Sequence, residues 1–295
     1  MKFFNIYTFE NFVYRLSNTV ISFIKIIFSS KFKSDISKIK TKKETCYVLG
    51  NGPSLNKDLL NNSDHLKQSE LVVVNFFAKS DLYQQLKPQY YVLADSGFYS
   101  DNNAEDVQNK IVELFDVLKV KTTWDLFLLI PYNGLKYITP HLRSNANIHI
   151  VGYNNASSKN TFFWFDKIVH DKQLAIFSGM NVATVASYLS IVAGFKEINL
   201  IGVDHSYFKN YTVGNDNEIY INHNHFYGNT NNNIIPVNLI NPKTKQLYKL
   251  HELLMCDIVI FETYHMIEKY AQYRNVKIYN RCSSSFIDAF ERKNN

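Results

Sequence analysis

The feature that most constrains the fold is a series of short apolar runs, each ending in a turn of small polar residues. Between these runs lie stretches in which apolar residues recur at the spacing of a helix. The clearest run is residues 46–49, and the turn Gly-Asn-Gly-Pro-Ser at 50–54 follows it directly. Residues 71–74, 90–94 and 198–201 are further runs of this kind. Apolar runs alternating with helices are typical of strands buried on both faces of a parallel sheet. We therefore predict an α/β fold with a Rossmann-like, doubly wound and mainly parallel sheet.

The turn after the first run has residues that suit a ligand-binding loop. Gly50 and Gly52 allow a positive φ and a close approach of ligand to backbone. Pro53 presets φ for helix entry, and Ser54 is a suitable helix cap. The N–H groups of such a first turn form an anion site. The turn lacks the Gly-Lys-Ser/Thr of a P-loop and the spacing of a dinucleotide fingerprint, so an ordinary strand-to-helix turn stays the alternative.

Small or polar residues stand at the carboxyl ends of the predicted strands. They are Asn51, Asn75, Asp95, Gly202, Asp204 and Ser283. Ser178 is predicted to cap a helix over about residues 179–193. Ligands bind parallel sheets outside the carboxyl ends of the strands, which favours a site where these residues converge. The alternative is that polar residues end most strands.

The composition agrees with a folded, intracellular protein. The chain has 295 residues, of which 46% are hydrophobic and 20% charged, enough for one large α/β domain and against disorder. Cys46, Cys256 and Cys282 fit no zinc spacing and suit a reducing cytoplasm. The net charge of +6 is modest, and the aromatic residues form no base-stacking pattern, so we predict no nucleic-acid partner.

Residues 1–43 differ from the rest. Apolar residues recur there at three- and four-residue spacings, which predicts an amphipathic helix of roughly five turns. They are Phe12, Val13, Leu16, Val20, Phe23, Ile24, Ile27 and Phe28. Arg15, Asn18 and Lys25 interrupt them, so no unbroken apolar span of about 18 residues exists.

A cluster of lysines follows this helix. Its members are Lys31, Lys33, Lys38, Lys40, Lys42 and Lys43. An apolar face beside a basic cluster is typical of a helix that lies on anionic lipid. We therefore predict that residues 1–43 are a basic, membrane-proximal segment at the cytoplasmic, inner face of a membrane. The alternative is a packing helix followed by a solvated linker.

Residues 44–295 are predicted to form the catalytic domain, with an insertion over 205–247. That insertion is rich in Asn, Tyr and His and shows neither strand nor helix periodicity, which is typical of a lid or binding loop. Helical spacing returns over 248–274. A last strand at 276–279 and a polar turn at 280–285 precede a predicted final short helix.

Several of these stretches together resemble the bacterial sialyltransferases of glycosyltransferase family 42. Residues 50–55 resemble their nucleotide-binding loop, and Asn-Phe-Phe at 75–77 resembles their Asn-Gln-Phe. Residues 178–204 resemble their central Ser-Gly to Gly-Ile-Asp block, and 276–287 their closing strand and serine turn. The Gly-Asn-Gly-Pro-Ser and Gly-Val-Asp pattern is also similar to motility-accessory proteins proposed to transfer nonulosonic acids and to pterin pyrophosphokinase-like domains.

The resemblance implies a cytidine monophosphate sugar as the donor. Its phosphate or ribose would contact the opening loop, namely Gly50, Asn51, Gly52, Pro53 and Ser54. Asn75 would contact the sugar or phosphate, and Ser178 and Gly179 would hold the sugar carboxylate. The resemblance places the cytidine or ribose against Gly202, Asp204 and Ser283, and the leaving phosphate against Tyr207 and Tyr211.

The catalytic base does not follow directly from the resemblance. The family has a lid histidine at the position that matches Asn229, which cannot accept a proton. His225 is the first candidate, since it lies in the matching lid segment, and His223 and His205 follow, because imidazole titrates near neutrality. Asp95 at a strand end is the substitute, and the alternative for each histidine is an ordinary surface residue.

These observations predict a glycosyltransferase that builds a cell-surface glycan. The chain has no Asp-x-Asp pair, which favours a metal-independent transfer that needs no cofactor. The expected reaction proceeds with inversion, from a CMP-linked acidic sugar as the donor to a glycan or lipid-linked glycan as the acceptor. A pyrophosphokinase-type enzyme on the same fold is one alternative. A non-catalytic, membrane-docked accessory protein that binds glycan or nucleotide is another. The oligomeric state stays open, a homo-oligomer included.

Overall fold

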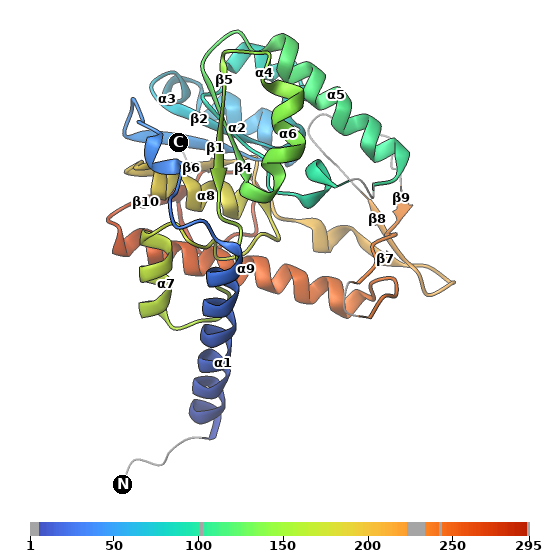
Figure 1. Ribbon diagram of the computed structural model, residues 1–295. Coiled ribbons are helices and arrows are strands. Elements are labelled where there is room, and N and C mark those ends of the chain that lie inside the picture. Colours follow the sequence, from blue (N-terminus) through green and yellow to red (C-terminus); the bar gives the residue numbers. More distant parts are fainter. Residues whose placement is uncertain (1–5, 101–102, 223–233, 242–243, 294–295) are drawn as a thin grey trace.

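The computed structural model describes residues 6–100, 103–222, 234–241 and 244–293 (Figure 1). Within these residues, eight parallel strands form one sheet in the order β11-β10-β6-β1-β2-β3-β4-β5. The strands are β1 (Thr45–Leu49), β2 (Glu70–Val74), β3 (Tyr90–Val92), β4 (Leu126–Pro131), β5 (Ile148–Tyr153), β6 (Glu197–Ile201), β10 (Lys277–Asn280) and β11 (Glu291–Arg292). This confirms the predicted Rossmann-like α/β fold.

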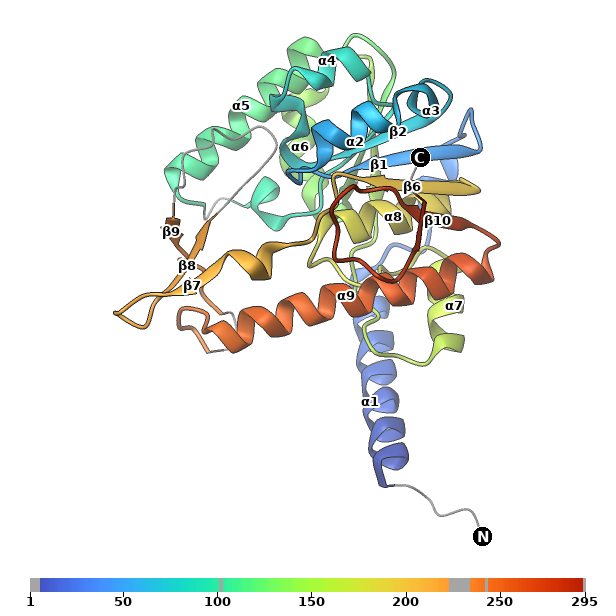
Figure 2. The same ribbon diagram turned by 180° about the vertical axis from the view of Figure 1, so that it is seen from behind.

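The strand order changes direction next to β1. The chain runs outward from β1 through β2, β3, β4 and β5, and then returns to place β6 on the other side of β1. Helices joining parallel strands cover both faces of the sheet (Figures 1 and 2). In open parallel sheets, ligands bind at such a point of reversal, outside the carboxyl ends of the strands. The loops that follow β1 and β6 therefore have the position that favours a binding site.

Alternating residues of each strand face two separate hydrophobic cores. Cys46 and Val48 of β1 pack in one core with α8 and α9, whereas Tyr47 and Leu49 pack in the other. The helices are α2 (Leu55–Asn61), α3 (Ser63–Lys67), α4 (Leu82–Leu86), α5 (Glu105–Lys121), α6 (Leu135–Leu142), α7 (Phe163–Asp171), α8 (Val182–Ala193) and α9 (Leu250–Tyr273). Because α8 lies between the sheet and α9, it is apolar nearly all round.

The predicted lid contains regular structure, contrary to the sequence-based prediction. After a 3₁₀ turn, η5 (Tyr207–Asn210), the strands β7 (Tyr211–Val213), β8 (Ile219–Asn222) and β9 (Ile234–Pro236) form an antiparallel sheet. Strands of three or four residues are too short for alternation to stand out in the sequence. The predicted final helix is also wrong, because the chain after β10 turns irregularly and ends in the parallel strand β11.

An N-terminal helix, α1 (Ile6–Ser29), projects away from the rest of the molecule (Figures 1 and 2). Its 24 residues give a length of about 36 Å, longer than the sequence pattern predicted. The side that meets the body carries the buried Thr19, Ser22 and Ile26, and Ile26 packs against Phe165 and Val169 of α7. The Thr19 hydroxyl accepts a hydrogen bond of 3.2 Å from the Phe162 N–H. Many of the exposed side chains of α1 are large and apolar, namely Phe9, Phe12, Val13, Tyr14, Leu16, Val20, Ile21, Phe23, Ile24, Ile27 and Phe28.

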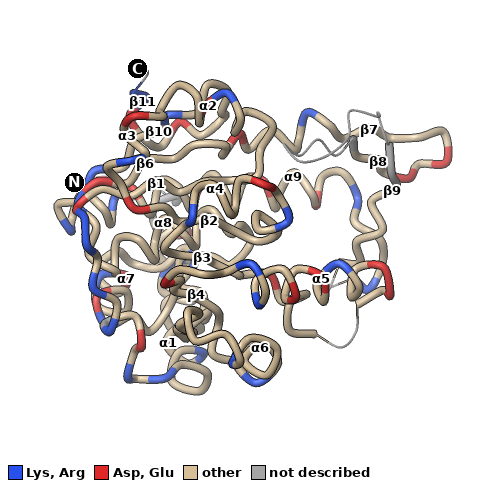
Figure 3. The backbone as a smooth tube through the Cα atoms, turned by 90° about the horizontal axis from the view of Figure 1, so that it is seen from above, with Lys and Arg blue, Asp and Glu red and all other residues tan. Residues whose placement is uncertain are grey.

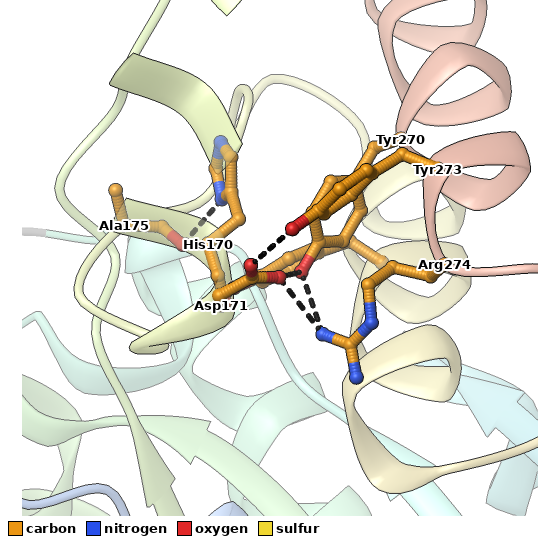
Figure 4. Close-up of polar contacts among 7 residues, drawn as sticks. His170, Asp171, Ala175, Tyr270, Tyr273 and Arg274 are labelled. Atoms are coloured by element: carbon orange, nitrogen blue, oxygen red, sulfur yellow. Dashed lines mark hydrogen bonds and ion pairs between the residues drawn. The ribbon is translucent and has the colours of Figure 1, made fainter. Parts of the chain in front are cut away.

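Helix α7, which lies beside α1, is fixed to α9 through the carboxylate of Asp171 (Figure 4). Asp171 accepts hydrogen bonds from the hydroxyls of Tyr270 and Tyr273 at 2.9 and 3.0 Å, and Arg274 Nη1 lies 3.0 Å away. The adjacent His170 is fully buried, and burial lowers its pKa to about 3. Both of its ring nitrogens are hydrogen-bonded within the protein, so we assign His170 a structural role.

Candidate functional site

The loops that follow β1 and β6 are joined directly by hydrogen bonds. The Gly52 N–H donates to the Gly202 carbonyl at 2.8 Å, and the Ser54 N–H donates to Asp204 Oδ2 at 3.1 Å. Because these N–H groups already have partners, the predicted use of the whole turn as an anion site is wrong. The two loops instead form one rigid edge at the point where the sheet reverses.

The glycines of the first loop are needed for this close approach. A Cβ atom at Gly50 would lie 2.3 Å from the Gly202 carbonyl oxygen, and one at Gly52 would lie 2.0 Å from Asp204 Oδ2. Gly50 and Gly52 do not use the positive φ that glycine allows, since the described glycines with positive φ are Gly194 and Gly202. Steric space between two loops, rather than backbone conformation, therefore accounts for these two glycines.

A buried carboxylate that the sequence reasoning missed links the loops to a third one. Asp58 Oδ2 accepts from Ser54 Oγ at 2.7 Å and from the Gly202 N–H at 2.9 Å, and Oδ1 accepts from the Ser283 N–H at 2.7 Å. Asp58 is fully buried. Ser54 does occupy the cap position of α2, but its hydroxyl bonds to Asp58 and makes no cap hydrogen bond. Asp58 could have been found from the sequence, because it lies four residues after Ser54 and therefore on the same face of the helix.

A cavity of about 310 Å³ opens over these loops. Its lining residues that were predicted from the sequence are Gly50, Asn51, Gly52, Pro53, Asn75, Gly202, Asp204, His205 and Tyr207. Ser54 is buried beneath the cavity, and Ser283 is exposed outside it. Burial raises the pKa of Asp204, while the N–H of Ser54 stabilises its charged form.

Three buried polar atoms of this cavity have no hydrogen-bond partner within the described chain. They are Asn51 Oδ1, Asn75 Oδ1 and His205 Nε2. The Asn51 amide nitrogen donates to the Val74 carbonyl at 3.2 Å, which directs the side chain across the end of β2. Buried polar atoms normally find partners, so a ligand with hydrogen-bonding groups is the expected occupant.

The backbone is also unusual at this cavity. Asn75 and His205 have φ values of +48° and +52°, in the left-handed region that non-glycine residues rarely adopt. Six other described non-glycine residues also have a positive φ, so this conformation does not mark the cavity on its own. Asn75 directly follows β2, and His205 lies in the loop after β6.

The positive end of α8 closes another side of the cavity. The cap of this helix is Asn181, whose side chain accepts a 2.8 Å hydrogen bond from the Ala183 N–H. The prediction that Ser178 caps the helix from about residue 179 is therefore wrong. Ser178 Oγ accepts from the Met180 N–H at 3.3 Å in the preceding turn, away from the cavity lining.

A second, larger cavity of about 1030 Å³ adjoins the first. The two share Asn75, Asn181, Val182 and Tyr207 as lining residues. The second cavity also contains three residues predicted from the sequence, namely Asp95, Gly179 and Tyr211. Two adjoining cavities can hold two ligands next to one another, which is the proximity that a reaction between them needs.

The candidate bases are in different surroundings. His205 is buried, and burial lowers its pKa to about 4, so its imidazole is neutral at pH 7. Asp95 is exposed and accepts a 2.9 Å hydrogen bond from the Gly97 N–H at the start of η3 (Ser96–Tyr99). His223 and His225 lie outside the described residues.

Within the described residues, no three His, Cys, Asp or Glu side chains come together as a metal site.

Comparison with known proteins adds a family. No curated protein matched the sequence. Among solved structures, the chain is similar to the MAf glycosyltransferase from Magnetospirillum magneticum AMB-1, with 10% identity and a TM-score of 0.49. The similarity covers 94% of this chain but only 38% of that protein. The family model described as 6-hydroxymethylpterin diphosphokinase MptE-like matches residues 18–210, and the chain therefore belongs to the MptE-like family.

Proposed function

We propose that the protein is a glycosyltransferase of cell-surface glycan synthesis that uses a nucleotide sugar, with inversion and without a bound metal ion. The donor is a CMP-linked acidic sugar, as the resemblance to the sialyltransferases implies. The nucleotide occupies the first cavity, and the acceptor is a glycan or lipid-linked glycan.

The unpaired polar atoms of the first cavity carry this proposal. Asn51 Oδ1 and Asn75 Oδ1 are acceptors, which suit the hydroxyl groups of a ribose or a sugar and the amino group of a base. The positive end of α8 favours a negatively charged group, as a phosphate or a sugar carboxylate provides. These are the groups of a nucleotide linked to an acidic sugar.

The family supports a second candidate, a diphosphokinase that transfers pyrophosphate from ATP. Such a reaction requires Mg²⁺ held against the phosphates by carboxylates. Among the described residues that line the first cavity, Asp204 is the carboxylate, and it already accepts a hydrogen bond from Ser54. The remaining polar groups are amides, hydroxyls, an imidazole and backbone groups, which suit the metal-independent reaction better.

Nucleotide titration separates these candidates. We expect CMP to bind without magnesium, and we expect Asn51→Ala to weaken binding by about tenfold or more, because one to two hydrogen bonds are lost. Asn56→Ala, an exposed asparagine on α2, is the matched control and should bind like wild type. Isothermal titration with CMP, UDP and ATP, with and without magnesium, is the measurement. Binding of ATP only with magnesium would favour the diphosphokinase, and no nucleotide binding would favour an accessory protein.

We also propose that α1 inserts its exposed apolar side into the inner face of a membrane. The segment Phe9–Ser29 is long and apolar enough to cross a membrane. Thr19, Ser22 and Ile26 are buried against the protein, whereas most of the apolar side chains of α1 are exposed, which leaves them free to contact lipid. Lysine and arginine segments lie along the same flank as α1 and α7 (Figure 3), where they suit anionic lipid.

Charges on the outer side of α1 should release the protein from membranes. Ile24 and Phe28 are 49% and 86% exposed, so Ile24→Glu with Phe28→Glu leaves the body-facing side intact. Each side chain contributes about 1.5–3 kcal/mol when buried in apolar surroundings. Binding to phosphatidylglycerol vesicles should fall by about two orders of magnitude in co-sedimentation. Leu60→Glu, an exposed leucine on α2, is the control, and equal binding by all three proteins would contradict the proposal.

A further inference from the structure

We propose that the second cavity binds the hydroxyl-bearing acceptor and that Asp257 accepts the proton of the attacking hydroxyl. This inference rests on the proposed transferase function. It names the catalytic base, which the sequence resemblance did not assign. Asp257 belongs to α9, outside every predicted strand end.

The position of Asp257 supports a chemical role. It lines the second cavity, where the N-terminal half of α9 lies beside β7–β9 (Figures 1 and 2). The residue is 7% exposed, and its Oδ2 is buried without a hydrogen-bond partner in the described chain. The hydroxyl of Tyr211 hydrogen-bonds to the carboxylate. A carboxylate oriented by one hydrogen bond, with a second oxygen unused, is suited to accept a proton.

The lining of the cavity indicates the class of acceptor. Five tyrosines contribute, which are Tyr99, Tyr153, Tyr207, Tyr211 and Tyr248. Tyrosine rings pack against the apolar faces of sugar rings, and their hydroxyls offer hydrogen bonds. Apolar residues surround the same space, including Ile221, Leu239, Leu253 and Ile260. The acceptor that fits is a sugar hydroxyl carried on an apolar group such as a lipid.

Tyr207 marks the junction where the two substrates would meet. It lines both cavities. Burial raises the pKa of its hydroxyl, and the charges of Asp204 and Asp257 raise it further. Since Asp204 lies in the first cavity and Asp257 in the second, Tyr207 lies between donor and acceptor. An acceptor oxygen beside Asp257 therefore faces the donor across this junction.

The transfer step balances with these groups alone. The acceptor hydroxyl gives its proton to the Asp257 carboxylate, and its oxygen forms a bond to the anomeric carbon. The bond between that carbon and the donor phosphate breaks, and the phosphate leaves with the electron pair. Tyr207 is placed to donate a hydrogen bond to the leaving oxygen. Asp257 then returns its proton to solvent.

The surroundings of Asp257 set its protonation. Burial raises the pKa of Asp257 to about 6, and the hydrogen bond from Tyr211 opposes this rise. The titratable groups near it are Tyr211 on β7, Tyr207 on η5 and Cys256 on α9, and burial raises the pKa of all three. All three are neutral at pH 7, so Asp257 titrates alone, and the transfer rate should rise with pH through about 6.

The test measures the titration of the Asp257 carboxyl group by NMR and, separately, the activity of the protein. The acceptor probe is octyl β-lactoside, which combines sugar hydroxyls with an apolar chain, and the donor probe is CMP-N-acetylneuraminic acid. The Asp257 carboxyl signal is identified by ¹³C NMR of protein with labelled aspartates, as the signal lost in Asp257→Asn. It should titrate near pH 6 and shift when octyl lactoside binds. A titration near the ordinary value of about 4, or no shift with saturating lactoside, would overturn the proposal.

The kinetic arm uses release of CMP from the donor probe. Asp257→Asn should lower turnover by about two to four orders of magnitude and leave CMP affinity unchanged. Tyr211→Phe removes the hydrogen bond that lowers the pKa of Asp257, so the acid limb of the rate should move to higher pH. Glu262→Gln, an exposed carboxylate on the same helix, is the matched control.

The two arms distinguish the inference from the proposed function. If wild type releases no CMP but octyl lactoside shifts the Asp257 signal, the donor assignment fails and the acceptor site stands. If Asp257→Asn releases CMP at the wild-type rate, the proton-accepting role is wrong.

Discussion

Asp58→Ala is expected to lower the free energy of unfolding by about 3–5 kcal/mol and to abolish nucleotide binding. The carboxylate accepts three hydrogen bonds, from Ser54 Oγ and from the N–H groups of Gly202 and Ser283. Hydrogen bonds to a charged group contribute about 1.5–3 kcal/mol each, and a buried donor left without a partner costs about 1–3 kcal/mol. Denaturant unfolding and titration with CMP are the two measurements.

The aspartate at position 64 provides the control for this prediction. Its side chain on α3 is 89% exposed and forms only a surface ion pair with Lys67. Asp64→Ala should therefore change the unfolding free energy by no more than about 0.5 kcal/mol. If Asp58→Ala were as stable as Asp64→Ala, the buried carboxylate would not hold the three loops together.

Gly50→Ala should disrupt the first cavity through the backbone of the two loops that line it. The new Cβ would lie 2.3 Å from the Gly202 carbonyl oxygen and 2.9 Å from the Gly202 carbonyl carbon, which are backbone atoms that cannot rotate away. The loops would have to separate, and the 2.9 Å hydrogen bond from the Gly50 N–H to the Ile201 carbonyl would be lost. We expect an unfolding free energy lower by about 1–3 kcal/mol and CMP affinity at least tenfold weaker.

Gly97→Ala is the matched control for the glycine prediction. A Cβ at Gly97 would have its nearest neighbour at 3.4 Å, an ordinary contact. The variant should bind CMP and unfold like wild type. Normal CMP binding by Gly50→Ala would show that the loops tolerate separation and that their close approach does not shape the site.

The sheet and the position of its binding edge could be predicted, because both depend on local patterns. Apolar runs such as residues 71–74 are strands whatever lies around them, and parallel strands bring their carboxyl ends to one edge. The prediction that Asn51 and Asn75 follow adjacent strands needed only this rule, and both line the first cavity.

The side chains that hold or complete the site could not be predicted, because their partners are distant in sequence. Asp58 bonds to residues 144 and 225 positions away, and nothing near Asp58 indicates them. Asp257 lies in a long helix whose spacing predicts only packing, and its cavity forms only when β7 comes alongside. The close packing of Gly50 could not be predicted for the same reason, since its neighbour is Gly202, which follows another strand.

The hydrogen bond between Asp58 and Ser283 also bears on the order in which parts of the fold can form during synthesis. Ser283 lies 225 residues after Asp58, close to the last strand of the sheet. A contact of such long range forms late, because the chain between its ends must be ordered first. Ribosome-bound chains that end before β10 would thus already contain all of α1, while the loops after β1 and β6 still lack their hydrogen-bonded partner at Ser283. The helix with the exposed apolar side would therefore be complete well before the first cavity takes its final form.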